Sequence, residues 1–141
     1  IDTMGNRPKV AQIISQKSYV NTEESVLVGR MKGEYDNGNG KKWKDENYMK
    51  FYNDGQVTFP YLSDGMWFLT QHRRWGLLKD DPDYLAIARQ VNQIALYKQA
   101  AALAKAAVPK EPMRSSKLID GVVWDGSDPA RYAGAFKVRA S

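Results

Sequence analysis

Helical periodicity between Ser63 and Ala107 is the feature that most restricts what this chain can fold into. Apolar residues recur at spacings of three and four in three successive segments, which are separated by Gly76 and interrupted near Asn92. The third segment, residues 94–107, is rich in alanine, the best helix former, and its small side chains allow another helix to approach closely. The periodicity therefore predicts a mainly helical structure.

Residues typical of helix ends accompany these segments. Ser63 is expected to cap the first helix, which Gly76 ends. Asp81 and Pro82 suit the cap and first position of the next helix. Asn92 is expected to mark a break or kink before the alanine-rich helix.

Two shorter helices are expected near the amino terminus. Residues 7–16 have helical spacing, with Pro8 where a first turn tolerates it. Asn21 and Glu24 have the spacing of a capping box, and Gly29 suits the end of the helix that follows.

Residues 31–61 differ in character, because glycines separate short aromatic runs. Residues 53–55, Asn-Asp-Gly, form a turn signal between residues 50–52 and 56–59, which suit strands. We therefore expect a small hairpin there, with residues 36–40 as an exposed loop.

The expected domain boundary lies between residues 112 and 113. Residues 1–112 are predicted to form a helical part, and residues 113–141 an irregular tail that packs on it, because Pro109 and Pro112 oppose further helix. Residues 122–124 suit one short strand. The tail carries several large apolar residues that could pack on its own domain or on a missing one: Leu118, Ile119, Trp124, Tyr132 and Phe136.

Composition excludes several kinds of site. Without cysteine, disulfide scaffolds, thiolate catalysis and thiolate zinc sites are impossible. The only histidine, His72, lies beside two arginines without a motif that supplies a nucleophile, so a solvated helix face is the favoured interpretation. Residues 36–40 look like a calcium loop but lack its acidic positions, and the acidic residues at 80–83 suit helix capping. No catalytic residue, metal or cofactor is predicted.

Charge leaves one distant alternative open. Twenty-one basic against sixteen acidic residues give a net charge of +5. Residues 41–44 and 72–75 place basic side chains beside a tryptophan, as a surface for single-stranded nucleic acid would. Acidic residues interrupt both regions, and no nucleic-acid motif is present. A basic helical nucleic-acid-binding module is therefore a distant alternative.

The stretch from Met49 to Leu78, MKFYNDGQVTFPYLSDGMWFLTQHRRWGLL, resembles the carboxyl-terminal region of the nitrate-binding family of ABC-transporter substrate-binding proteins. That family also includes bicarbonate-binding relatives and soluble nitrate sensors. The resemblance extends over practically the whole chain, through residues 6–8, 16–19, 29–36, 83–85, 90–92, 96–98, 118–121 and 124–129.

The resemblance implies a two-lobed α/β fold of the type II periplasmic-binding-protein kind, which closes on a small anion and delivers it to a membrane permease. This chain would be a mainly α-helical fragment of that fold with a few short strands. Residues 1–112 would be the helical carboxyl-terminal part of a solute-binding lobe, and residues 113–141 the tail. The implied function is nitrate capture for an ABC permease, not enzymatic, with a bicarbonate-binding or nitrate/nitrite-sensing relative as the alternative.

The family's anion-contacting residues are expected upstream of Ile1, so the fragment alone is expected to bind the anion poorly or not at all. We interpret the start without Met as a cut. The expected location is periplasmic or membrane-anchored on the outer face, or cytoplasmic for a sensor. The expected partners are nitrate or a related anion, the permease and the rest of the protein, with no nucleic acid.

A further hypothesis concerns three aromatic residues of the helix predicted after Ser63. Trp67, Phe68 and Trp75 are predicted to make one face that docks onto the missing lobe, or onto a second copy of the fragment in a homodimer.

Overall fold

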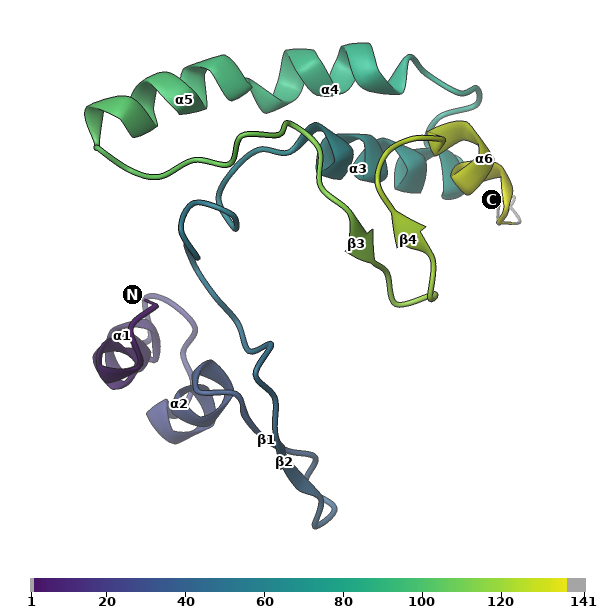
Figure 1. The fold of residues 1–141 in the computed structure, drawn as a ribbon. Helices are drawn as coiled ribbons and strands as arrows, with labels where there is room; N and C mark the ends of the chain where they lie inside the picture. Colours follow the sequence, from purple (N-terminus) through teal and green to yellow (C-terminus); the bar gives the residue numbers. More distant parts are fainter. Residues whose placement is uncertain (1, 137–141) are drawn as a thin grey trace. The chain divides into compact units, whose positions relative to one another are not determined.

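The computed structural model describes residues 2–136 and separates the chain into two compact units, Ile1–Thr58 and Phe59–Ser141 (Figure 1). The boundary expected between residues 112 and 113 does not coincide with this division, because residues on both sides of it belong to the second unit. A mainly helical chain with a few short strands is confirmed.

In the first unit, short helices precede an antiparallel hairpin. The elements are a 3₁₀ turn Met4–Asn6, α1 Arg7–Ile14, α2 Glu24–Met31, β1 Glu34–Asp36 and β2 Lys42–Lys44. Helix α1 lies where the sequence predicted it, with Pro8 in its first turn. The capping box is wrong: α2 starts after Glu23, whose side chain makes no cap bond, and Asn21 is left-handed with φ 52°.

The hairpin predicted around residues 53–55 is also wrong. The strands lie earlier, and residues 36–40, the expected loop, connect them. Residues 50–59 form turns rather than strands. The physical reason is a competing partner, because the N–H groups of Phe51, Tyr52 and Asn53 all donate to the Asp2 carboxylate. Those groups are therefore taken up by a side chain instead of a strand.

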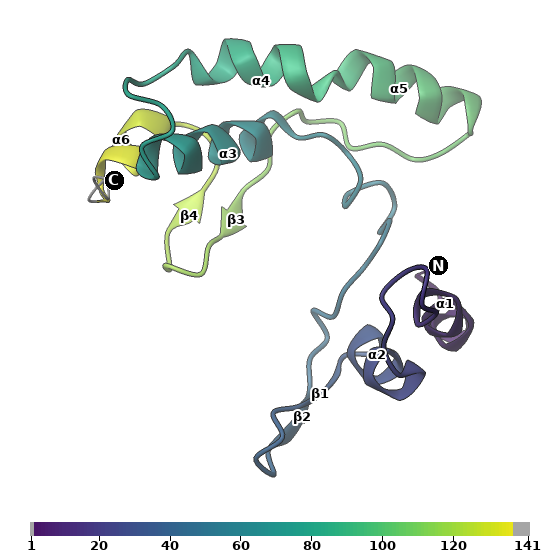
Figure 2. The same cartoon turned by 180° about the vertical axis from the view of Figure 1, so that it is seen from behind.

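The second unit contains α3 Leu62–Arg74, α4 Tyr84–Asn92, α5 Ile94–Leu103, β3 Ser116–Lys117, β4 Val123–Trp124 and α6 Pro129–Gly134. Helix α3 packs against α4 and α6. Figures 1 and 2 show α4 and α5 following one another along one line, while the antiparallel β3–β4 hairpin projects beyond α3 on the side away from α4.

Two of the predicted caps in this unit are wrong. Helix α3 begins at Leu62, and Ser63 is fully buried, where its Oγ accepts a hydrogen bond from the N–H of Arg114. Helix α4 is capped by Asp83, whose Oδ1 accepts from the N–H of Ala86, rather than by Asp81.

The break near Asn92 is confirmed. Helix α4 ends there, and Gln93 takes a left-handed conformation with φ 46° before α5 begins. The Asn92 Nδ2 donates to the carbonyl oxygens of Pro60 and Tyr61, at 3.2 and 2.6 Å. Asn92 thus ties the end of α4 to the segment that leads into α3.

The core of the second unit combines the helices with the carboxyl-terminal segment. It consists of Leu62, Met66, Tyr84, Ala88, Trp124 and Tyr132. The Trp124 Nε1 donates to the carbonyl oxygen of Ser63 at 2.8 Å. The short strand expected at residues 122–124 is present as β4, and Trp124 and Tyr132 of the carboxyl-terminal segment belong to this core.

The tail is nevertheless less irregular than predicted, because it contains α6. Asp128 caps this helix through its Oδ1, which accepts from the N–H of Arg131, and Pro129 occupies the first turn. An Asp-Pro pair thus starts a helix here, whereas the same pair at residues 81 and 82 does not.

Candidate docking site

The structure separates the three aromatic residues that were predicted to share one face. Phe68 on α3 and Trp75, which follows its last residue as the carboxyl-terminal cap, are seven residues apart and are 61% and 64% exposed. Trp67 is half-buried and packs against the core cluster of the second unit. The Trp67 and Phe68 rings still meet edge to face, with centroids 5.4 Å apart. One helical step, about 100°, directs neighbouring residues to different sides.

A groove lies where α3 meets the β3–β4 hairpin. Trp67 and Phe68 line it from α3, and Leu118 and Trp124 line it from the carboxyl-terminal segment. Trp67 lines the groove and also packs against the core cluster, whereas Phe68 stays exposed. The groove is therefore an apolar surface that the core supports from below. Such a surface suits packing against another apolar surface.

An ion pair lines the same groove. The Arg114 Nη2 lies 2.6 Å from the Asp64 Oδ2, and its Nε donates to the Asp64 Oδ1 at 3.0 Å. The guanidinium also lies over the Tyr61 ring, 4.8 Å from its centroid. Two-point pairing and stacking fix Arg114 in place, and they engage its charge with a carboxylate of the same chain.

Two core tyrosines act as hydrogen-bond donors. The Tyr84 hydroxyl donates to the Asp81 Oδ1 at 2.7 Å, and the Tyr132 hydroxyl donates to the Asp120 Oδ2 at 2.9 Å. Burial, with the neighbouring carboxylate, raises the pKa of each phenol. Both therefore remain neutral donors at ordinary pH, as is typical of tyrosines that anchor a core.

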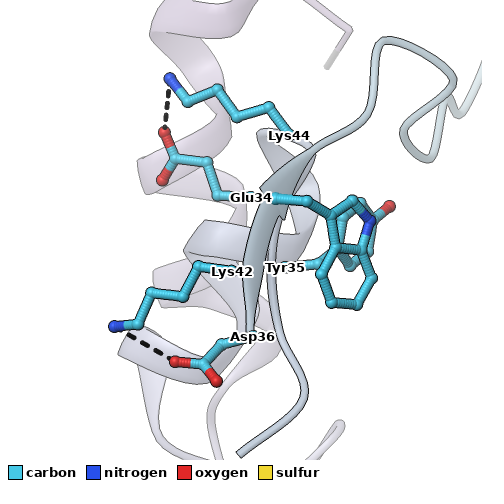
Figure 3. Close-up of a pocket in the computed structure, with 6 residues that line it drawn as sticks. Glu34, Tyr35, Asp36, Lys42 and Lys44 are labelled. Atoms are coloured by element: carbon cyan, nitrogen blue, oxygen red, sulfur yellow. Dashed lines mark ion pairs between the residues drawn. The ribbon is translucent and has the colours of Figure 1, made fainter. Parts of the chain in front are cut away.

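A second surface depression lies on the β1–β2 hairpin of the first unit. Side chains alternate between its two faces, so that Glu34 pairs with Lys44 at 3.5 Å and Asp36 with Lys42 at 3.2 Å on one face, away from Tyr35 (Figure 3). On the other face the rings of Tyr35 and Trp43 stack with centroids 5.4 Å apart.

Sequence reasoning missed this hairpin. The signal was present, because Glu-Tyr-Asp at 34–36 and Lys-Trp-Lys at 42–44 match charge for charge and ring for ring in antiparallel register. The Asp36 pKa is lowered by a hydrogen bond from the N–H of Gly38 and by Lys42. The carboxylate therefore stays charged, and both lysine charges face acidic partners.

A buried arginine also organises the first unit. Arg7 is 0% exposed, and its guanidinium lies over the rings of Tyr48 and Phe51, 5.4 and 5.3 Å from their centroids. Its Nη1 donates to the carbonyl oxygen of Met49 at 2.8 Å, and its Nη2 pairs with Asp2 at 3.1 Å. Every one of these contacts lies within the unit, so Arg7 serves the fold rather than an external anion.

The Asp2 carboxylate completes this arrangement. Partial burial opposes its charged form, but backbone N–H donors of Phe51, Asn53 and Tyr52, together with Arg7, lower the Asp2 pKa to about 2. We call Asp2, Arg7 and residues 48–53 the amino-terminal clamp.

Other expected features are ordinary surface. His72 is exposed on α3, as a solvated helix face would have it. Within residues 2–136, histidine and carboxylate side chains form no group of three that could hold a metal ion. Nor does that part of the chain contain a helix long and apolar enough to cross a membrane.

Comparison with known proteins shows which proteins this chain is similar to. No protein-family model matches the chain. The nitrate/nitrite binding protein NrtA of Nostoc sp. (strain PCC 7120) is 34% identical to it, over 98% of this chain and 32% of that protein. Over almost its whole length, the chain is therefore homologous to a segment of this binding protein.

The fold agrees with that relationship. The crystal structure of the periplasmic nitrate-binding protein NrtA from Synechocystis PCC 6803 matches with a TM-score of 0.83 and 31% sequence identity. The match covers 97% of this chain and 37% of that chain. The helices and short strands described above are therefore part of a periplasmic-binding-protein fold.

More distant relatives include other transport proteins. The bicarbonate-binding protein CmpA of Synechococcus elongatus is 26% identical over 98% of this chain and 33% of its own length. The nitrate import ATP-binding protein NrtC of Synechocystis sp. is 25% identical over 97% of this chain and 20% of its own length. The chain thus spans about a third of the NrtA and CmpA relatives that it matches, and less of NrtC.

Proposed function

We propose that this chain is part of a solute-binding protein that captures nitrate and delivers it to an ABC permease for uptake. The observation that carries the proposal is the 34% identity to a nitrate/nitrite binding protein across 98% of the chain. The proposed location is the periplasm or the outer face of the membrane, where a permease can receive the anion. The protein binds and releases its ligand without chemical change.

The segment by itself does not hold the anion. Nitrate needs converging donors or free positive charge in a closed site. The basic side chains that line the two depressions described above are already paired, Lys42 and Lys44 in the hairpin and Arg114 in the groove. This pairing supports an anion site built elsewhere in the full-length protein.

Calorimetric titration with nitrate tests both statements. The protein extended to the length of its relatives should bind nitrate stoichiometrically, and residues 1–141 alone should release no binding heat. Parallel titrations with bicarbonate and chloride identify the anion. Tight nitrate binding by residues 1–141 alone would overturn the assignment of the site, and preference of the extended protein for bicarbonate would overturn the assignment of the anion.

The exposed aromatic residues of α3 support a docking role within that protein. Phe68 and Trp75 remain largely exposed, while Trp67 joins the groove to the core. Burying both exposed rings against the rest of the lobe contributes several kcal/mol, at roughly 1.5–3 kcal/mol for each large side chain. A second copy of the segment is the alternative occupant.

Substitution on this face distinguishes the two occupants. Phe68→Ser with Trp75→Ser should lower the melting temperature of the extended protein by several degrees, and the exposed pair Lys79→Ser with Asp80→Ser serves as control. If residues 1–141 instead form a dimer that the aromatic substitutions abolish, the second copy is the occupant.

A further inference from the structure

Helix α5 is apolar on more than one side. Of its ten residues, Ile94–Leu103, Lys98 and Gln99 are the only ones with a charged or amide side chain. A helix that is hydrophobic all round is typically buried by its surroundings on all sides. Helix α5 therefore needs more covering than a helix at a protein surface.

One side of α5 has this covering within the second unit. Ala101 is buried, and the Tyr97 ring meets the Phe59 ring edge-on with centroids 5.5 Å apart. Ile94 packs against the core cluster. These three α5 residues are three and four positions apart, so they form a single face.

A second apolar face of α5 is exposed. Leu96 and Leu103, two turns apart, are 62% and 88% exposed, and Ala100 lies exposed between them. Figures 1 and 2 show that the segment after α5 turns back and runs along one side of this helix. We call Leu96, Ala100 and Leu103 the outer face of α5.

We propose that the outer face of α5 is a second docking surface, covered by an apolar helix from the remaining part of the solute-binding protein. The inference rests on the proposed function, because it takes the occupant from the longer protein. The chain accounts for only 37% of the solved NrtA chain, with which it shares its fold at a TM-score of 0.83. That relative therefore contains much more polypeptide than the part that matches this chain.

A helix fits this face better than a second copy does. Ala100, whose side chain is small, lies between the two leucines. A small residue there leaves room for a ridge of side chains from another helix, so that the axes of the two helices can lie about 8–10 Å apart. A stable dimer buries roughly 800 Å² on each partner, and three side chains on a ten-residue helix fall well short of that area.

Paired substitutions in the extended protein test the surface. Leu96→Ser with Leu103→Ser should lower its melting temperature by roughly 5 °C or more, since truncating leucines in a packed interface is costly. Amide hydrogen exchange of residues 94–103 should accelerate at least about tenfold. The control pair, the exposed Lys98→Ser on the same helix with the exposed Gln90→Ser on α4, should do neither.

The same pairs in residues 1–141 complete the test. There the leucine pair should change the melting temperature no more than the control pair, because its side chains are already exposed. Equal effects of the two pairs in the extended protein would overturn the proposal. So would an equally large effect of the leucine pair in both proteins, or a dimer of residues 1–141 that this pair abolishes.

Nitrate titration of the same samples keeps this inference separate from the proposed function. If the extended protein binds no nitrate but the leucine pair still destabilises it, the function fails and the docking surface stands. If nitrate binds and the leucine pair behaves like its control, the docking surface fails and the function stands.

Discussion

The two units of this chain are stabilised by different kinds of interaction. The first unit relies on the amino-terminal clamp, in which one carboxylate accepts three backbone N–H groups and one buried guanidinium contacts two aromatic rings. The second relies on an apolar core to which α3, α4 and the carboxyl-terminal segment all contribute. Directional polar bonds depend on charge state, whereas burial of apolar surface does not. The units should therefore fail under different conditions.

The largest expected effect is on the apolar core. Trp124→Ala removes a side chain that is 5% exposed, together with its hydrogen bond to the Ser63 carbonyl, and should cost about 3–5 kcal/mol of the second unit's unfolding free energy. Urea unfolding followed by circular dichroism measures this cost. The exposed Trp75→Ala is the matched control. Equal costs for the two tryptophans would contradict the described core.

The second-largest effect is expected from removing the buried guanidinium of Arg7. Arg7→Met keeps an apolar stem but leaves Asp2 without its ion pair, and should cost the first unit about 2–3 kcal/mol. Hydrogen exchange resolved by residue should show faster exchange in residues 48–53, with the second unit unchanged. Lys9→Met, which removes an exposed cation from α1 of the same unit, is the control. Loss of protection in both units would show that the clamp and the core are not independent.

Lowering the pH should destabilise the first unit more than the second, and by a smaller amount than the two substitutions above. The pKa of Asp2 is lowered from 3.8 to about 2, so its contribution is fully present above about pH 4 and is lost as the pH falls through 2. After allowance for the partial exposure of this carboxylate, the loss is about 1 kcal/mol. Hydrogen exchange at pH 5 and pH 2.5 measures it, and Asp2→Asn should flatten the dependence of the first unit.

The smallest effect is expected at the β1–β2 hairpin. Lys44→Ala breaks an exposed ion pair with Glu34 and should change the unfolding free energy by less than about 0.5 kcal/mol. Tyr35→Ala, which removes the ring stacked on Trp43, should cost more, about 0.5–1 kcal/mol. A larger cost for Lys44→Ala than for Tyr35→Ala would mean that charge, rather than ring stacking, stabilises this hairpin.

Local spacing was enough to predict the helices before the carboxyl-terminal segment, because helical periodicity is a property of neighbouring residues, but it missed α6. It placed α1 and the helices on both sides of the break at Asn92, and the resemblance in residues 49–78 indicated the family that the comparisons support. It could not rank equivalent signals: Asp-Pro starts α6 at residue 128 but not α4 at residue 81. Asp81 instead accepts from the Tyr84 hydroxyl.

The three aromatic residues of the proposed docking face show the same limit. Spacing placed Trp67, Phe68 and Trp75 on one helix, and the structure confirms that the first two lie within α3 and that Trp75 caps it. Spacing did not reveal that the carboxyl-terminal segment would return to half-bury Trp67 and leave the other two exposed. That outcome depends on Trp124, which is distant in sequence from α3 and packs in the core beside it.

The sequence by itself determined the helical segments before residue 104, where the chain breaks between α4 and α5, and that it resembles nitrate-binding solute-binding proteins. Only the tertiary structure decided where the hairpin forms, which aspartates cap helices, and which aromatic rings stay exposed. The reason is competition for partners. A backbone N–H near Asn53 can pair with a strand or with the Asp2 carboxylate, and only the folded chain brings Asp2 close enough to decide.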